Sequence, residues 1–400
     1  MPHIAIAGAG IGGLTAAIAL SRVGAIVTVY ERAETLAEVG AGVQLSPNAT
    51  AVLARLDLLD ALREKAVEPT ETLLRRSRDG ASLARIPLGT RASQRYGSPF
   101  LVVLRADLQA ALVTRAKRDP AITLRLGQGV SAYRKVEHGV CLTFGDLPHP
   151  AVTLDGLVGA DGIRSTVRQS MMGPSPDDTK PSGRSAWRSL VARDVADPEA
   201  LVARSNLWLG AGAHLVHYPV DGGKLVNVVA VIDETVGAGR DAFWSMPAEA
   251  ATLERRFATW AEPARRLIAA APGWRKWPLF DRPPLRRWSD GAATLLGDAA
   301  HPMLPFLAQG AAQAIEDAGV LADCVAKSRE GLPAAFQTYE GLRRPRTARV
   351  QVESRRQGSV YHLGAPASLL RDIVLRSLGP DRLTARYDWI YAGPATISRA

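Results

Sequence analysis

The sequence is poor in cysteine and has no long apolar run. Only Cys141 and Cys324 occur among its 400 residues, which excludes a disulfide framework, and neither lies in the spacing of metal ligands. This usage favours a reducing compartment, so we expect a cytoplasmic protein without a metal site. No apolar run approaches the ~18 residues that span a bilayer. Because an apolar segment starts at Ile4 with no basic leader before it, we expect no signal peptide.

The net charge of +10 is concentrated near the end of the chain. Between Gly341 and Ala400 there are eleven arginines and four acidic residues, and this difference of seven charges is most of the total. The tract matches no known nucleic-acid module, so we interpret it as a solvated face and expect no nucleic-acid partner. A positive field also attracts small anions and pyridine nucleotides.

The first thirty residues predict a strand, a glycine-rich turn, a helix and a second strand. Gly8 permits a tight turn, Gly10 lets the backbone approach a pyrophosphate, and Gly13 allows close packing of helix on strand. Glu31 ends the second strand, where a carboxylate can accept ribose hydroxyls. This context predicts a Rossmann-like unit holding a dinucleotide, and the alternative is a glycine-rich turn without a ligand. Because no second fingerprint occurs, a nicotinamide nucleotide would have to visit by another route.

Two later segments strengthen this interpretation. Residues 159–165 place Asp161 and Gly162 in a turn after a strand, with arginines beyond it, which suits a phosphate-handling loop. Residues 297–302 follow a buried strand, and Asp298 could accept a hydrogen bond from a ribityl hydroxyl. The helix predicted from about Gln309 would point free N–H groups at a ligand, and this would stabilise negative charge on a reduced flavin. Taken alone, each segment could be an ordinary turn or helix cap.

The middle of the chain has a different pattern. Runs between residues 186 and 232 alternate like strands of an antiparallel sheet, and Pro174, Pro176 and Pro181 mark the crossing into it. The period of two places His214, Val216 and Tyr218 on one face. A histidine there could take a proton from a phenol, and a tyrosine could orient that phenol. The alternative is a pair of partly exposed sheet residues.

We predict an α/β protein with a discontinuous Rossmann-like cofactor domain, an inserted and mostly antiparallel sheet domain, and C-terminal helices. The cofactor domain takes residues 1–70, 100–170 and 281–345, the inserted sheet domain takes 71–99 and 171–280, and the helical segment is 346–400. Single helices are expected over 47–59, 105–117, 248–270, 310–328, 333–363 and 366–377, and a strand over 70–86.

With these segments assembled, the chain resembles the single-component FAD-dependent aromatic hydroxylases, or class A flavoprotein monooxygenases. Within them it is most similar to the branch acting on salicylate, 3-hydroxybenzoate and 6-hydroxynicotinate. The matching segments run over nearly the whole length: residues 8–13, 31–32, 40–48, 104–108, 159–165, 186–188, 297–302 and 387–391.

The resemblance implies a set of roles. The residues expected to bind FAD are Gly8, Gly10, Gly13, Glu31, Arg32, Val43, Arg105, Val130, Asp161, Gly162, Asp298, Gly310 and Ala311. Those expected beside the substrate are Gln44, Pro305 and Gln309, with His214 and Tyr218 as the catalytic pair that activates a phenol.

The implied reaction is hydroxylation of a small phenolic or N-heteroaromatic acid. NADH or NADPH would reduce the FAD, and O2 would then form a flavin C4a-hydroperoxide that attacks the ring. The alternatives are a flavin monooxygenase of a bulkier, polyketide-like substrate, a flavoprotein reductase that never activates oxygen, and a non-catalytic FAD-binding protein. The resemblance is also compatible with a homodimer.

Overall fold

The computed structural model describes residues 1–36, 41–145, 150–173, 179–234 and 246–393. Gly40, which starts one motif, and Pro174 and Pro176, at the expected crossing, lie outside these residues. The strands are β1 His3–Ala7, β2 Ile26–Glu31, β3 Gly42–Leu45, β4 Glu71–Arg76, β5 Ser82–Pro87, β6 Leu101–Leu104, β7 Ile122–Leu126, β8 Val130–Val136, β9 Gly139–Phe144, β10 Val152–Leu154, β11 Gly156–Gly159, β12 Lys180–Ala192, β13 Ser205–Gly210, β14 Ala213–Val220, β15 Leu225–Asp233, β16 Met246–Ala248, β17 Trp274–Asp281, β18 Ser289–Asp290 and β19 Ala293–Leu295. The helices are α1 Ile11–Arg22, α2 Pro47–Arg55, α3 Leu59–Arg63, α4 Thr90–Tyr96, α5 Arg105–Lys117, α6 Thr166–Met172, α7 Ala250–Phe257, α8 Glu262–Ala269, α9 Gly310–Lys327, α10 Leu332–Tyr361, α11 Ala367–Ser377, α12 Pro380–Ala385 and α13 Asp388–Tyr391.

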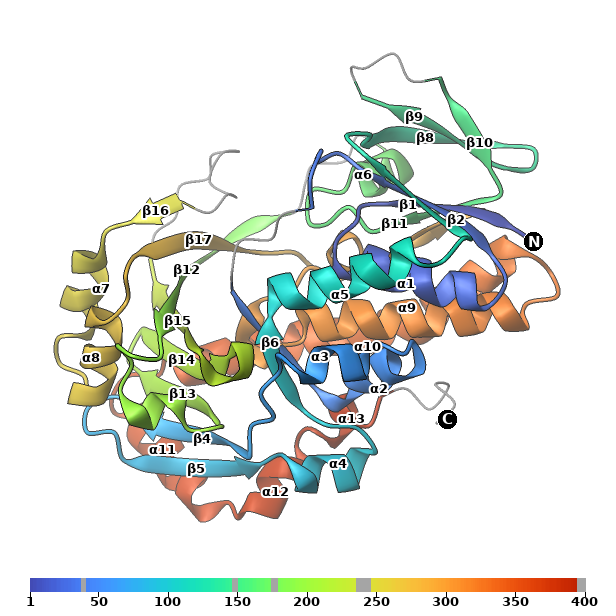
Figure 1. The fold of residues 1–400 in the computed structure, drawn as a ribbon. Coiled ribbons are helices and arrows are strands. Elements are labelled where there is room, and N and C mark those ends of the chain that lie inside the picture. The colour runs from blue at the N-terminus through green and yellow to red at the C-terminus, as the bar shows by residue number, and fades with distance from the viewer. Residues whose placement is uncertain (37–40, 146–149, 174–178, 235–245, 394–400) are drawn as a thin grey trace.

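A six-stranded sheet of order β18-β19-β11-β1-β2-β7 forms the centre of one half of the molecule. Its strands from β19 to β7 are parallel, and β18 alone runs antiparallel at the edge. Helices α1, α5, α9 and α10 lie along one side of this sheet, and the three-stranded sheet β10-β9-β8 lies on the other (Figure 1). The strands are continuous apolar runs because both faces are covered. This confirms the predicted α/β fold class.

An eight-stranded sheet of order β16-β17-β12-β15-β14-β13-β4-β5 forms the other half. It is antiparallel except where β13 runs parallel to β4. Helices α7 and α8 cover its outer face, packing Phe257 and Trp260 against strand residues such as Trp187 and Leu215 (Figure 1). The opposite face points toward the six-stranded sheet and the C-terminal helices, so it is free to form the wall of a site between the two halves.

Three predicted elements are divided in the structure. The helix expected over 47–59 ends at Arg55 and restarts as α3, because Asp57 has a positive φ of 58° that no helix accommodates. The strand expected over 70–86 is the hairpin of β4 and β5. The helix expected over 248–270 is α7 and α8, with Pro263 in the first turn of the second, where a proline fits best.

The basic tract is only partly the solvated face that we predicted. Arg343 on α10 is fully buried and pairs with Glu316 and Asp317 of α9. Arg371 is 8% exposed and pairs with Asp372. The pairs of Arg343 fasten α10 to α9, and Arg371 joins α11 to the end of α10 by donating to the carbonyls of Val360 and Tyr361. Each buried cation meets a carboxylate, as burial of charge requires.

Candidate active site

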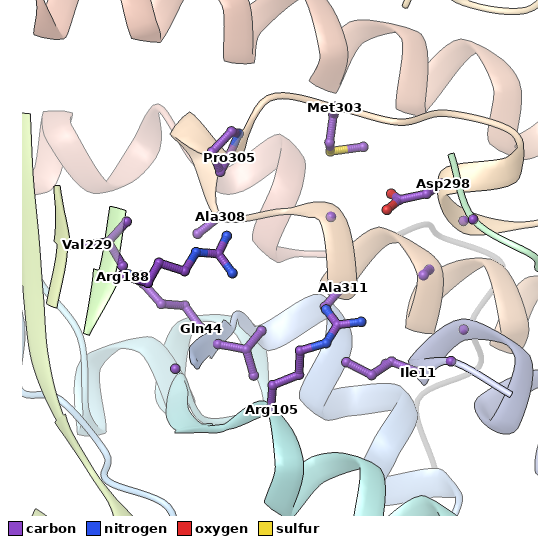
Figure 2. A pocket seen from close by; sticks show the side chains of 18 of the residues that line it. Ile11, Gln44, Arg105, Arg188, Val229, Asp298, Met303, Pro305, Ala308 and Ala311 are labelled. Carbon is purple, nitrogen blue, oxygen red and sulfur yellow. The ribbon is translucent and has the colours of Figure 1, made fainter. Parts of the chain in front are cut away.

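The three glycine-containing motifs meet at one cavity of about 340 Å³. Gly10 and Gly12 line it from the first motif, Gly162 from the second, and Gly297 and Asp298 from the third. Ligand pockets have volumes of roughly 300 to 1,000 Å³, so the cavity is large enough for one. Segments far apart in the sequence therefore converge on one space, as expected for one long ligand held at several points (Figure 2).

The turn between β1 and α1 has the backbone that the fingerprint requires. Gly8 has a φ of +101°, and a Cβ on it would lie 2.5 Å from the carbonyl oxygen of Ala160. A Cβ on Gly13 would lie 2.0 Å from the carbonyl oxygen of Gly8. Gly10 meets no atom within 4 Å, so open space adjoins the start of α1, whose N–H groups suit a phosphate.

Glu31, Arg32 and Val130 do not lie on the cavity wall. The Glu31 carboxylate accepts hydrogen bonds from the backbone N–H groups of Ala9 and Ala33, both at 2.9 Å. Arg32 packs against Gly129, and the carbonyl of Val130 accepts a hydrogen bond from Thr166. Their roles toward a cofactor stay predictions.

The second motif is tied to the third by a buried arginine. Asp161 accepts hydrogen bonds from the backbone N–H groups of Thr166 and Val167, so its carboxylate holds the start of α6. Arg168 is 2% exposed and donates to the carbonyl of Ala299 at 3.0 Å. Of this motif, Ala160 and Gly162 line the cavity, whereas Asp161 does not.

The third motif places a carboxylate and a helix start at the cavity. Asp298 lies in a short 3-10 turn, Gly297–Ala299, is exposed, and points into the cavity (Figure 2). Gly310 and Ala311 begin α9 and line the cavity, and Pro305 lies on the loop before them. The N–H groups of this first helical turn face the cavity and favour negative charge there.

Gln309 does not line the cavity. Its side chain is 1% exposed and donates to Ser46 at 2.8 Å, while its oxygen accepts from Asn48 and Gln313 at 3.3 and 3.0 Å. Asn48 in turn donates to the buried Glu316. The structure therefore places the Gln309 side chain in a buried polar network beneath the cavity floor rather than beside a substrate.

Strand β3 and helix α5 supply another part of the wall. Val43 and Gln44 lie on β3, which pairs antiparallel with β6, and the residue after β6 is Arg105. Arg105 begins α5 as predicted, and its guanidinium points into the cavity opposite Asp298 and below Ala311 (Figure 2). All three sequence-predicted residues line the cavity.

The eight-stranded sheet forms the far wall. The predicted alternation of β14 is confirmed, because His214, Val216 and Tyr218 line the cavity and Leu215 packs on the opposite face. Neighbouring strands add Arg188 from β12 and Val229 and Val231 from β15. Register places Arg188, Val229 and Val216 in one row across three strands, with His214 and Tyr218 on either side of Val216.

His214 is neutral at physiological pH. It is 3% exposed, and burial lowers its pKa well below 6.5, followed by repulsion from His362 when that imidazole is protonated and from the charge of Arg184. Its Nδ1 lies 2.7 Å from Nε2 of His362, so Nε2 is the ring nitrogen left for a molecule in the cavity. Burial also raises the pKa of Tyr218, although the charge of Arg188 opposes this, so Tyr218 stays protonated and can donate.

Three residues had no role assigned from the sequence, one on this wall and two behind it. Arg188 extends from β12 into the cavity between Gln44 and Ala308 (Figure 2), and its guanidinium lies 5.1 Å from the ring centre of Trp277. Alternation could have found it, since a cation on a strand face otherwise meant for the core indicates a pocket. His362 contacts His214 directly, and Asp233 contacts His362. No local sequence pattern predicts either contact.

Comparison with known proteins identifies the family. A model of the FAD binding domain matches residues 2–354. The chain belongs to the single-component FAD-dependent aromatic hydroxylases. A 3-amino-4-hydroxybenzoate 2-monooxygenase of Streptomyces platensis is 40% identical to it, covering 98% of this chain and 96% of the relative. A 3-hydroxybenzoate 6-hydroxylase of Aquipseudomonas alcaligenes is 35% identical, covering 99% of both. A salicylate hydroxylase solved as a substrate complex is 28% identical, with a TM-score of 0.82, covering 98% of this chain and 95% of that one.

The residues present fit FAD, the cofactor of this family. Two helix N-termini face one cavity, Gly10 leaves open space beside the first, and the exposed carboxylate of Asp298 lies between them. Such sites suit a dinucleotide in which a chain of hydroxyls joins a pyrophosphate to a reducible ring. None of the helices in the described part of the chain combines the length and the hydropathy that a membrane crossing needs.

Proposed function

We propose that this protein hydroxylates a small phenolic or N-heteroaromatic acid, using O2 and NADH or NADPH. The observation that carries the proposal is the sheet wall, which presents an arginine and a neutral histidine to the cavity across from the start of α9. The bound flavin supplies the electron transfer and oxygen activation that no side chain provides. The residues of this chain bind the acid, orient its ring and move its proton.

Arg188 is suited to hold the substrate carboxylate. A guanidinium offers a planar fork of donors that matches a carboxylate, and the ring of Trp277 supports it at 5.1 Å. The names of the two relatives fit a site that binds a carboxylate, because both include a hydroxybenzoate. A carboxylate held at Arg188 would direct the ring between Val229, Val216 and the loop at Pro305, where apolar side chains exclude water.

His214 is suited to accept the phenolic proton, and Tyr218 to donate a hydrogen bond to the same oxygen. The two side chains lie on one face of β14, on either side of Val216. Removing the proton raises the electron density of the ring, which makes it a better nucleophile. Because the pKa of His214 is lowered by burial, the base stays in its accepting form across neutral pH.

The test is a panel of 3-hydroxybenzoate, 3-amino-4-hydroxybenzoate, salicylate and 6-hydroxynicotinate. A true substrate should accelerate the oxidation of NADH or NADPH. Its hydroxylated product should carry one oxygen atom from isotope-labelled O2. His214→Asn should slow this hydroxylation roughly 100-fold while FAD stays bound. If every acid leaves the oxidation rate unchanged and all oxygen appears as peroxide, the proposal is wrong and a reductase is the better assignment.

The cellular setting is part of the proposal. The reaction consumes a reduced nicotinamide, and Cys141 and Cys324 are both buried and free, so we place the protein in the cytoplasm. We also propose a homodimer, which gel filtration with light scattering would test.

A further inference from the structure

A line of hydrogen-bonding side chains runs from the cavity to the protein surface. Nδ1 of His214 lies 2.7 Å from Nε2 of His362, and Nδ1 of His362 lies 2.6 Å from Oδ1 of Asp233. The three residues come from β14, from the end of α10 and from the last position of β15. The side chain of His362 is 3% exposed and that of Asp233 is 47% exposed, so the line begins buried and ends in solvent.

Aromatic rings enclose the buried end of this line. The ring centre of His214 lies 5.5 Å from that of Phe306 and 5.3 Å from that of Tyr361. Among the described residues, His362 is the polar side chain that bonds His214. A proton reaching His214 from the cavity therefore has a hydrogen-bonded route outward at His362, while the rings keep bulk water from the imidazole.

The carboxylate at the outer end fixes where the protons sit. Burial would raise the pKa of Asp233, but hydrogen bonds from Arg184 and His362 outweigh it and lower the pKa, so Asp233 is ionised and only accepts. His362 must then carry its proton on Nδ1, which leaves Nε2 to accept from Nδ1–H of His214. His214 is left with a lone pair on Nε2, the nitrogen available to the cavity. A surface carboxylate thus sets the cavity histidine as an acceptor.

We propose that His214, His362 and Asp233 form a proton relay between the substrate phenol and solvent. The proposal deepens the proposed function and rests on it. The phenolic O–H bond breaks as Nε2 of His214 gains a proton, and the proton on its Nδ1 passes to Nε2 of His362. The proton on Nδ1 of His362 passes to Asp233 and from there to water, so one proton leaves and a phenolate remains. A proton returning along the same line when the product oxygen is protonated resets both imidazoles.

The surrounding charges suit such transfer. Arg184 donates to Oδ1 of Asp233 at 2.9 Å, Arg256 donates to the carbonyl of Ala211, and the charges of both arginines help to keep His362 neutral at rest. Burial lowers the pKa of His362, and Asp233 opposes this without outweighing it, so His362 rests neutral with one proton to pass on. Its place at the C-terminus of α10 favours the cation that forms briefly as a proton passes.

The first test needs no substrate. Nitrogen NMR of histidine-labelled holoenzyme distinguishes a protonated from an unprotonated ring nitrogen, and His214→Asn and His362→Gln assign the signals. Both imidazoles should be neutral with the proton on Nδ1. In Asp233→Asn the amide can donate, so the His362 tautomer should no longer be fixed. If either imidazole carries its proton on Nε2 in the wild type, the relay as drawn is wrong.

The second test follows the proton. The oxidised enzyme is mixed rapidly with 3-hydroxybenzoate in the presence of a pH indicator. The indicator reports the proton that is released, and ultraviolet absorbance reports the phenolate that forms. Asp233→Asn and His362→Gln should each slow proton release roughly tenfold or more at unchanged affinity. Imidazole added to His362→Ala should restore the rate, which a packing role would not allow. Asp281→Asn is the matched control, since Asp281 also ends a strand of this sheet and pairs with Arg355.

The two tests separate this proposal from the one on which it rests. Proton release at the wild-type rate in Asp233→Asn and His362→Gln, with FAD still bound, overturns the relay and leaves the hydroxylase intact. If 3-hydroxybenzoate and the other acids of the panel release no proton in the wild type while NMR shows both Nδ1 tautomers, the proposed substrate class is wrong and the hydrogen-bonded line remains. Asp233 lies at the surface, so its variant should fold.

Discussion

The two large sheets form opposite halves of one cavity by different means. The half built on the six-stranded sheet contributes mostly backbone and small residues, namely glycines, alanines and the N–H groups that begin α1 and α9, with the side chains of Arg105 and Asp298 beside them. The eight-stranded sheet contributes side chains, with Arg188 and His214 projecting from separate strands. A backbone surface suits a cofactor that never changes, whereas a side-chain surface can be altered one residue at a time. Cofactor binding and substrate choice are therefore separable in this fold.

The largest effect should come from a methyl group on the backbone half. In Gly13→Ala the new Cβ would lie 2.0 Å from the Gly8 carbonyl oxygen, so the turn must shift. We expect a loss of about 3 kcal/mol in the free energy of unfolding, together with loss of FAD. Gly10→Ala is the matched control, because no protein atom lies within 4 Å. It should change stability by at most about 1 kcal/mol yet still weaken FAD binding.

Flavin fluorescence on titration and denaturant unfolding of both variants measure the two effects. Equal stability of the two variants would contradict the steric argument, and tight FAD binding by Gly10→Ala would show that the open space beside α1 is not the cofactor site.

On the side-chain half, Arg188→Gln should raise the KM for the aromatic acid between about 10-fold and 100-fold, since a hydrogen bond to a charged group contributes about 1.5 to 3 kcal/mol. FAD content should not change, because Arg188 belongs to the other half. Steady-state kinetics with 3-hydroxybenzoate measure this. Arg193→Gln, at an exposed position just beyond β12, should leave KM unchanged. A fall in FAD occupancy in Arg188→Gln would break the proposed separation.

The smallest effect concerns pH. Burial, then the charges of Arg75 and Arg204, lowers the pKa of His217 to about 3, whereas the unfolded chain titrates near 6.5. Below pH 6.5 the unfolded state takes up a proton that folded His217 does not, so stability is lost as pH falls. From pH 7.5 to 5.5 this costs about 1.4 kcal/mol. His217→Gln should reduce that pH dependence and exposed His138→Gln should not, as measured by urea unfolding at both pH values.

The same contrast explains what the sequence could predict. The glycine turn at residues 8–13 is a local pattern that forms its surface wherever a strand meets a helix, so its shape follows from spacing. The position of His214 and Tyr218 on the same face of the sheet follows from the two-residue period of a strand. The cofactor, the fold class and the family are confirmed. The domain boundaries and the individual site roles stay predictions.

Contacts between segments far apart in the sequence could not be predicted from local patterns. His362 reaches His214 from 148 positions along the chain. Gln309 precedes a helix that faces the cavity, yet its amide turns to Ser46 and Asn48 because those partners arrive from α2. Asp57 divides a predicted helix through one positive φ that residue type does not announce. Each of these depends on packing that only the assembled structure defines.

Helix α10 carries a consequence for how this protein can vary. It buries Arg343 beneath the cofactor side of the cavity and delivers His362 to the substrate side. The two positions are nineteen residue steps apart, which is about 28 Å of helix. Deleting one of them would turn His362 by about 100° and withdraw it by about 1.5 Å. Surface loops tolerate insertions and deletions. The length of α10 between Arg343 and His362 does not, because a change of one residue would break the contact between His362 and His214.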